Sequence, residues 1–440
     1  MRSERAENIE AAPLGEPTAS RYRVVIVFML GLATLVNFLI LFNLGVLLPS
    51  ISEDLDLSPS EQGWLGSSAI LANLAFSLPL GWLVSRLNAK LVTTVTLVAA
   101  AFFLFVQGWA PVFAVLLVGR VLFGIAGVAR EPARAMLTQQ WIPSREIVLM
   151  NGLLNGTIGV AIAIGFFLTP FMLLWFDDDW RIALYIYAVA TLVVAVAWHL
   201  LGKERITPSY RQQARSQKGT PLGSLFRYRE LWAMGVGLAG ANLLWMAFIT
   251  FWPTQMLDDY DVSLVSSGAL MAVSGLVSAV FGLIFSLAMM KRDIGRWVLM
   301  LCGVLITSTS AGMVMTGSLP LLVLMSLFNG VGWSFFPIMM TLPFKLPGIK
   351  PREIAVAVAF YEMAIWAGGA VGPALAGILQ EATDDLRLTL VVLSFFGLCL
   401  TLGAVFLPTM GWREIAPELA PTGELAPVSD GHDLPGPATR

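Results

Sequence analysis

Long apolar stretches separated by short polar gaps fill the chain between residues 22 and 408. An α-helix needs about 20 apolar residues to cross the ~30 Å hydrocarbon core of a bilayer, and a helix satisfies its own backbone there. Twelve stretches meet that length, and each predicts a transmembrane helix. They run roughly over residues 22–48, 62–84, 91–110, 112–135, 147–174, 181–201, 230–257, 263–290, 296–316, 320–342, 353–379 and 387–408.

Lysine and arginine residues lie almost entirely in alternate gaps between these stretches. They cluster before the first stretch and after each even-numbered one, whereas the remaining gaps hold only Arg181 and Arg387. Loops rich in lysine and arginine stay on the cytoplasmic side of a membrane. The pattern therefore predicts a multi-pass protein of the inner or plasma membrane, with both termini in the cytoplasm.

Composition agrees with this class. Hydrophobic residues make up 57% of the chain and charged residues 13%, whereas about a quarter of a soluble domain is charged. The 27 basic and 29 acidic residues are segregated by side, which argues against a nucleic-acid partner. Two cysteines and two histidines are too few for a metal site. No nucleotide-binding loop or catalytic triad is present, so we expect no cofactor and no enzyme.

The longest internal gap, residues 202–229, holds seven basic residues and predicts a cytoplasmic central loop. It divides the chain into an N-terminal six-helix half, residues 22–201, and a C-terminal six-helix half, residues 230–408. Residues 1–21 are polar and predict a cytoplasmic segment without a signal peptide. Residues 409–440 are rich in proline, glycine and acidic residues, which is typical of a disordered cytoplasmic tail.

The two halves are similar in sequence when the chain is shifted by 205 residues. Asn37 then falls on Asn242, and Gly63 falls on Gly268. A shift by six helices keeps the direction in which each helix crosses the membrane. The sequence therefore predicts a parallel repeat, related by an axis along the membrane normal.

The loop after the second stretch carries a recognisable motif. Gly81, Arg86 and Lys90 match the pattern G-x-L-x-D-R-x-G-R-R, although Ser85 and Asn88 replace its aspartate and second glycine. With the twelve stretches and the parallel repeat, this motif makes the chain resemble the major facilitator superfamily over about residues 20–408. The resemblance implies an all-α membrane protein of twelve helices in two parallel-repeat halves. It also implies a substrate site between the halves near the membrane midplane.

Two ionisable residues lie deep inside predicted helices. Arg120 comes nine residues after Pro111, roughly 13 Å into its helix, and Glu362 comes ten residues after Arg352, at a similar depth. A charge there costs at least ~2.5 kcal/mol and is a functional hypothesis by default. By resemblance to the family, Arg120 binds an anionic group or supports proton coupling. Glu362 is a lone carboxylate in a low-dielectric site, which makes it the candidate to carry the proton. Alternatively, both residues are packing devices bonded to backbone carbonyls.

Polar and aromatic residues interrupt the apolar helices near these positions. The repeat symmetry of Asn37 and Asn242 favours two matching positions that face a central cavity and contact substrate, although such residues can equally join neighbouring helices. Trp245 and Tyr361 are candidates to stack on a substrate. In a chain with 14 tryptophans and 26 phenylalanines, packing is the competing interpretation.

Residues at helix ends and bends are candidates for gating. Arg130 and Glu131 come about ten residues after Arg120, so we expect them near the inner end of the fourth helix, in a solvated or gating ring. Gly372 and Pro373 allow the eleventh helix to pack tightly and bend. We assign the motif residues Gly81, Arg86 and Lys90 to the same role.

Together these observations predict a secondary carrier that moves a small polar metabolite by alternating access. We expect an organic or inorganic anion as substrate, protons as the coupling ion in a symporter, and a monomer surrounded by the lipid bilayer. One alternative is a proton-linked exporter of drugs or metabolites, because Gly156, Gly165 and Pro170 match half of an exchanger motif. A second alternative is a carrier-like sensor that does not transport.

Overall fold

The computed structural model describes residues 22–84, 86–142, 147–205, 228–289, 294–342 and 351–407. These ranges are almost entirely α-helical and contain no β-strand. The predicted N-terminal segment, most of the central loop and the tail lie outside them. Eleven segments of the described residues are long and apolar enough to cross a membrane, and one further helix, Pro59–Val84, has 26 residues. The predicted all-α membrane fold is therefore confirmed.

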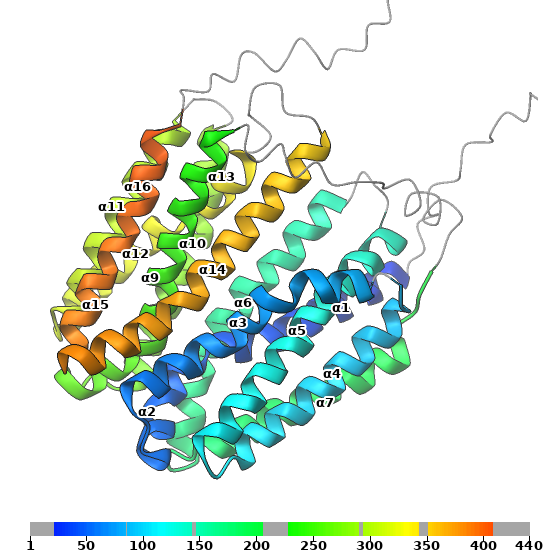
Figure 1. Ribbon diagram of the computed structural model, residues 1–440, viewed down its shortest axis with the longest axis horizontal. Helices are drawn as coiled ribbons and strands as arrows, with labels where there is room; N and C mark the ends of the chain where they lie inside the picture. The colour runs from blue at the N-terminus through cyan, green and yellow to red at the C-terminus, as the bar shows by residue number, and fades with distance from the viewer. Residues whose placement is uncertain are drawn as a thin grey trace, which may run out of the picture.

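The helices form two groups that lie side by side (Figure 1). The first group is α1 Tyr22–Phe42, α2 Leu44–Leu55, α3 Pro59–Val84, α4 Ala89–Trp109, α5 Phe113–Trp141, α6 Ile147–Trp175 and α7 Trp180–Leu201. The second group is α9 Arg229–Tyr260, α10 Leu264–Met289, α11 Gly295–Val314, α12 Leu319–Trp333, α13 Phe336–Thr341, α14 Pro351–Thr383, α15 Leu386–Ser394 and α16 Leu398–Val405.

Three of the predicted helices are interrupted. The first predicted stretch is divided at Asn43 into α1 and α2. The tenth is divided between α12 and α13 at Ser334 and Phe335, and the twelfth contains a 3-10 turn at Phe395–Gly397 between α15 and α16. Each interruption lies inside a spanning segment without ending it, so the number of crossings stays the same.

The two halves repeat the same ion pair at equivalent positions. Asp54, near the end of α2, pairs with Arg181 of α7 at 2.5 Å, and Asp259, near the end of α9, pairs with Arg387 of α15 at 3.2 Å. Each arginine also lies over an aromatic ring beside it. These are the two arginines that the basic-residue pattern left in the other gaps. They close the same end of each half, which we call the outer end after the predicted topology.

Helix α5 is longer at its inner end than predicted. Its hydropathy predicted an end near residue 135, but the helix continues to Trp141, whose indole Nε1 donates to the Lys203 carbonyl at 2.9 Å. The Trp141 ring also lies 5.9 Å from the Tyr22 ring. Arg130 is therefore eleven residues, or about 16 Å, from the inner end of its helix. The expectation that Arg130 and Glu131 lie near that end was wrong.

The halves meet at their outer ends through close backbone contacts. A Cβ atom on Gly63 of α3 would lie 2.5 Å from the Pro373 carbonyl oxygen of α14, so only glycine permits this approach. One turn further in, the Ala374 amide donates to the Ser67 hydroxyl at 2.8 Å. We call these contacts and their equivalents on neighbouring helices the outer seam. Its residues are Gly45, Gly63, Ser67, Phe166, Ile249, Gly268, Pro373 and Ala374.

Replacing a seam glycine should separate the halves. A Cβ on Gly268 of α10 would collide with the Phe166 carbonyl oxygen of α6, which is backbone and cannot move alone. We therefore expect Gly268→Ala to lower the melting temperature and reduce transport. Gly275→Ala, on the same helix with no atom within 4 Å of the added Cβ, is the control. Equal effects of the two substitutions on stability and transport would contradict the seam.

Candidate functional site

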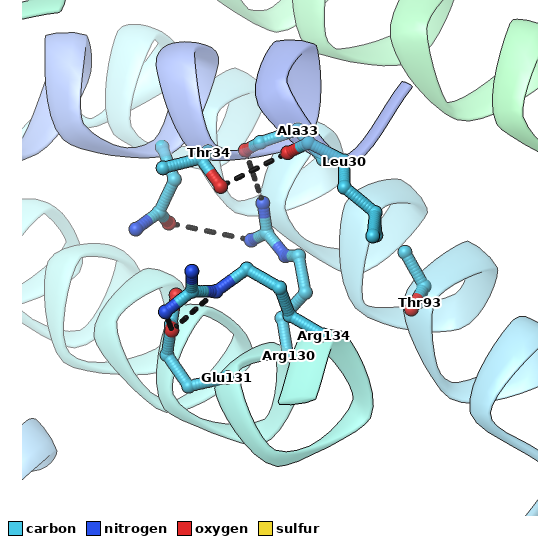
Figure 2. Close-up of a pocket in the computed structure, with 8 residues that line it drawn as sticks. Leu30, Ala33, Thr34, Thr93, Arg130, Glu131 and Arg134 are labelled. Atoms are coloured by element: carbon cyan, nitrogen blue, oxygen red, sulfur yellow. Dashed lines mark hydrogen bonds and ion pairs between the residues drawn. The ribbon is translucent and has the colours of Figure 1, made fainter. Parts of the chain in front are cut away.

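A narrow pocket opens between α1 and α5, and among the described residues its charged lining residues are Arg130, Glu131 and Arg134. The Arg130 side chain is 5% exposed. Its guanidinium donates to the Ala33 carbonyl at 3.1 Å and to the Asn37 side-chain oxygen at 3.3 Å. The Arg130 Nε has no partner. Figure 2 shows the guanidinium directed from α5 toward α1.

The sequence of α5 brings these groups together by helical spacing. Gly127, Arg130, Glu131 and Arg134 recur at three- and four-residue intervals and so lie on one face of the helix. A Cβ on Gly127 would lie 2.9 Å from the Asn37 side-chain oxygen. The glycine therefore lets α1 approach closely enough for Arg130 to reach both Ala33 and Asn37.

Arg134 forms the second charged group of the pocket. Its guanidinium pairs with Glu131 at 2.6 Å, and its Nε donates to the same carboxylate oxygen at 2.8 Å. The side chains are 21% and 40% exposed. Figure 2 shows the pair beside the Arg130 guanidinium. The pair is neutral as a unit, so the net charge of the pocket comes from Arg130.

Glu362 of the other half lies near two of the charged residues of this pocket. It lies seven residues before Gly369, so the two residues share one face of α14. Gly369 lies against Ile70 of α3, near the outer seam. The Glu362 side chain is exposed. It interacts electrostatically with Glu131 and Arg134. No cation of the described residues lies within 4 Å of its carboxylate.

Asn242 and Trp245 lie on the matching face of α9. They are seven and four residues before Ile249, which contacts Gly45 in the outer seam, and both are partly exposed. The Asn242 amide donates to the Leu238 carbonyl of its own helix at 3.1 Å. The Trp245 ring lies 4.9 Å from the Trp333 ring. The prediction that Asn242 contacts substrate stays a prediction, and among the described residues its amide donates within its own helix.

The structure places Arg120 in a different environment from the substrate-contacting position that the sequence predicted. It is 3% exposed and enclosed within the N-terminal half. Its guanidinium donates to the carbonyls of Leu65 and Leu41, each at 3.1 Å. In this conformation it joins α5 to α1 and α3, which is the packing alternative. Tyr361 is likewise enclosed, at 1% exposure, against Phe360.

The predicted gating residues fall into two groups. Gly372 and Pro373 belong to the outer side, where Gly372 lies against the Leu243 carbonyl of α9. Gly81, Arg86 and Lys90 lie at the inner end. The Arg86 guanidinium covers the Trp82 ring at 3.9 Å, and the Lys90 carbonyl accepts from an indole. A Cβ on Gly81 would have no atom within 4 Å.

Two partly exposed residues near these positions were not singled out from the sequence, Asn73 and Trp333. Asn73 of α3 lies seven residues after the seam-side Gly66, which contacts Pro373, and it is partly exposed. Trp333 is identified only from the contact of its ring with the Trp245 ring in the structure. The seven-residue spacing from Gly66 could have identified Asn73. No sequence signal distinguishes Trp333 from the other tryptophans.

Comparison with known proteins decides the family. The profile of the Major Facilitator Superfamily matches residues 30–350. The chain belongs to this superfamily. Several relatives of the chain are named as transporters.

The chain is similar to the "Probable L-galactonate transporter" of Escherichia coli (strain K12). The two are 27% identical over 274 residues, covering 59% of this chain and 60% of the relative. It is also 24% identical to the "Probable galactarate/D-glucarate transporter GudP" of Bacillus subtilis (strain 168), over 73% of this chain and 79% of that protein. The "Uncharacterized transporter YybO" of Bacillus subtilis (strain 168) is 26% identical, with 60% of its length covered.

Solved structures confirm the fold. The chain superposes on a bacterial homologue of the human lysosomal transporter Spinster, in an inward-facing and unoccupied conformation, with a TM-score of 0.75 and 15% identity. The match covers 89% of this chain and 98% of that one. The nucleoside transporter NupG matches with a TM-score of 0.71 and 17% identity, over 86% of this chain and 99% of its own.

The hydrogen bond between Arg130 and Asn37 predicts the effect of a substitution at position 37. Asn37→Asp would place a carboxylate where the amide oxygen now lies, 3.3 Å from Arg130, and the new buried ion pair would neutralise the pocket. We expect the melting temperature to be kept or raised. We also expect the affinity for organic anions, measured by ligand-induced thermal shift, to fall at least about tenfold. Asn88→Asp, at the N-cap of α4, is the control because aspartate caps helices as well as asparagine.

Proposed function

We propose that this protein is a secondary carrier of small organic anions of the sugar-acid class, working by alternating access with proton coupling. The observation that carries the proposal is Arg130, a buried guanidinium with no carboxylate of the described residues within 4 Å. An uncompensated buried cation is costly and is a functional hypothesis by default inside a membrane. The carboxylate of a substrate would supply the missing charge.

The position of Arg130 supports this role. It lies about 16 Å from the inner end of α5, on the face that also carries Arg134, and Glu362 of the other half interacts electrostatically with that face. A substrate bound there would contact both halves. Relatives named as transporters of galactonate, galactarate and glucarate support a polyhydroxy acid. Amides such as Asn37, Asn73 and Asn242 suit its hydroxyls.

The outer seam supports alternating access. The halves pack backbone to backbone at the outer end, while Glu362 and the adjacent Met363 of α14 are exposed further in. This arrangement fits a state that is closed outside and open inside. We further propose that both termini lie in the cytoplasm and that the protein works as a monomer in the plasma membrane.

Glu362 is proposed to carry the proton. It is an acidic residue of α14 that lies near charged residues of the pocket, and it has no cation at ion-pair distance among the described residues. Protonation would remove a negative charge from the wall opposite Arg130. A substrate anion would then be repelled less, which links proton binding to substrate binding.

The substrate assignment can be tested with purified protein in liposomes. We expect counterflow of galactonate or galactarate in the wild type. Arg130→Gln should raise the dissociation constant at least about tenfold, because it removes one partner of a buried charge pair worth 2 kcal/mol or more, roughly. Arg229→Gln, whose side chain is 88% exposed, should leave the constant unchanged. Binding of hydrophobic cations alone would instead support the drug-exporter alternative.

The proton assignment requires a separate measurement. Glu362→Gln should abolish accumulation driven by a pH gradient while leaving counterflow, since counterflow needs no proton movement. Glu381→Gln lies on the same helix near its outer end and is exposed, so it should accumulate substrate normally. Wild-type accumulation by Glu362→Gln would remove Glu362 from the coupling step.

A further inference from the structure

Few charged residues of the described chain line the pocket that would hold the substrate. Its lining contains Arg130, Glu131 and Arg134, and Glu362 of the second half lies near two of these residues. Relatives of the chain are named for monocarboxylic sugar acids and for dicarboxylic ones, so similarity does not choose between them. The arrangement of the charges distinguishes the two classes of acid.

Arg134 is already occupied. Both its Nη2 and its Nε contact the same Glu131 oxygen, at 2.6 and 2.8 Å. The two residues lie three apart on α5, so helix geometry alone holds them together. A substrate carboxylate would have to displace Glu131 before it could use the Arg134 guanidinium.

Arg130 is the one guanidinium of this pocket that no carboxylate occupies. Its Nη atoms contact oxygens of α1, which are neutral, and its Nε has no partner. The lining therefore has a net charge of +1. A single carboxylate neutralises the lining, whereas a second carboxylate would meet Glu131 and no free cation of the described lining. Like charges brought together in such a site cost several-fold in affinity or more.

We propose that the protein selects monocarboxylic sugar acids over dicarboxylic ones, and that Glu131 sets this selectivity by masking Arg134. The proposal rests on the proposed function. Glu131 acts as a specificity-determining residue through Arg134 and need not contact the substrate. Its removal should expose a second anion site, one helical turn from the first.

Galactonate and galactarate are a matched pair for the test, because they differ only at C6, a hydroxymethyl group in one and a carboxylate in the other. Dissociation constants for both would be measured by thermal shift and by counterflow, at a pH where all substrate carboxylates are ionised. The wild type should bind galactonate at least about tenfold more tightly. Glu131→Gln should reduce or invert this ratio by at least about tenfold.

The double variant Glu131→Gln/Arg134→Gln is the decisive control. It removes both charges of the pair, restores the wild-type net charge, and should restore the preference for galactonate. Glu61→Gln, at the outer end of α3, should leave the ratio unchanged. If Glu131→Gln does not fold, Arg134→Gln alone should widen the preference, because Glu131 then repels the second carboxylate.

Two results would overturn the proposal. One is a wild type that binds galactarate as tightly as galactonate. The other is a double variant that accepts galactarate as the single variant does, which would assign the change to shape rather than charge. A wild type that binds neither acid would instead contradict the proposed function itself, so the two failures are distinguishable.

Discussion

The hydrogen bonds from Arg130 to α1 hold a buried positive charge in the pocket between α1 and α5. A guanidinium inside a membrane bundle needs partners, and here backbone and amide oxygens hold it without cancelling its charge. The close approach of α1 and α5 at Gly127 makes this arrangement possible. The cavity therefore keeps a positive wall on one side. A carboxylate at position 37, where the side-chain oxygen accepts from Arg130, would cancel this charge.

The internal repeat explains the similar helix frames of the two halves but not the different charged and aromatic residues that they carry. Both halves close their outer ends with an aspartate–arginine pair at equivalent positions. Their walls differ, because α5 presents cations while α9 and α14 present Trp245 and Glu362. The two halves thus share a similar frame and differ in the charged and aromatic residues that these helices carry.

The sequence predicted the fold well because the strongest signals were not local. Apolar length, the alternation of basic gaps and the repeat each depend on the bilayer, which acts on the whole chain. The site was harder to predict. The end of α5 depends on the contact between Trp141 and the Lys203 carbonyl, and hydropathy does not record such a contact. The enclosure of Arg120 depends on which helices surround it, so depth along the helix correctly marked it as unusual without identifying its partners.

The outer seam is built from glycines, backbone oxygens and one hydrogen bond from Ala374 to Ser67, and no ion pair of the described residues crosses it. Separating these surfaces would move no charged side chain through the electric field of the membrane. Work done by a membrane potential scales with the charge that moves, about 2.3 kcal/mol per charge for each 100 mV. The voltage therefore has little to act on when the seam parts. Its influence falls on the charges carried between the halves.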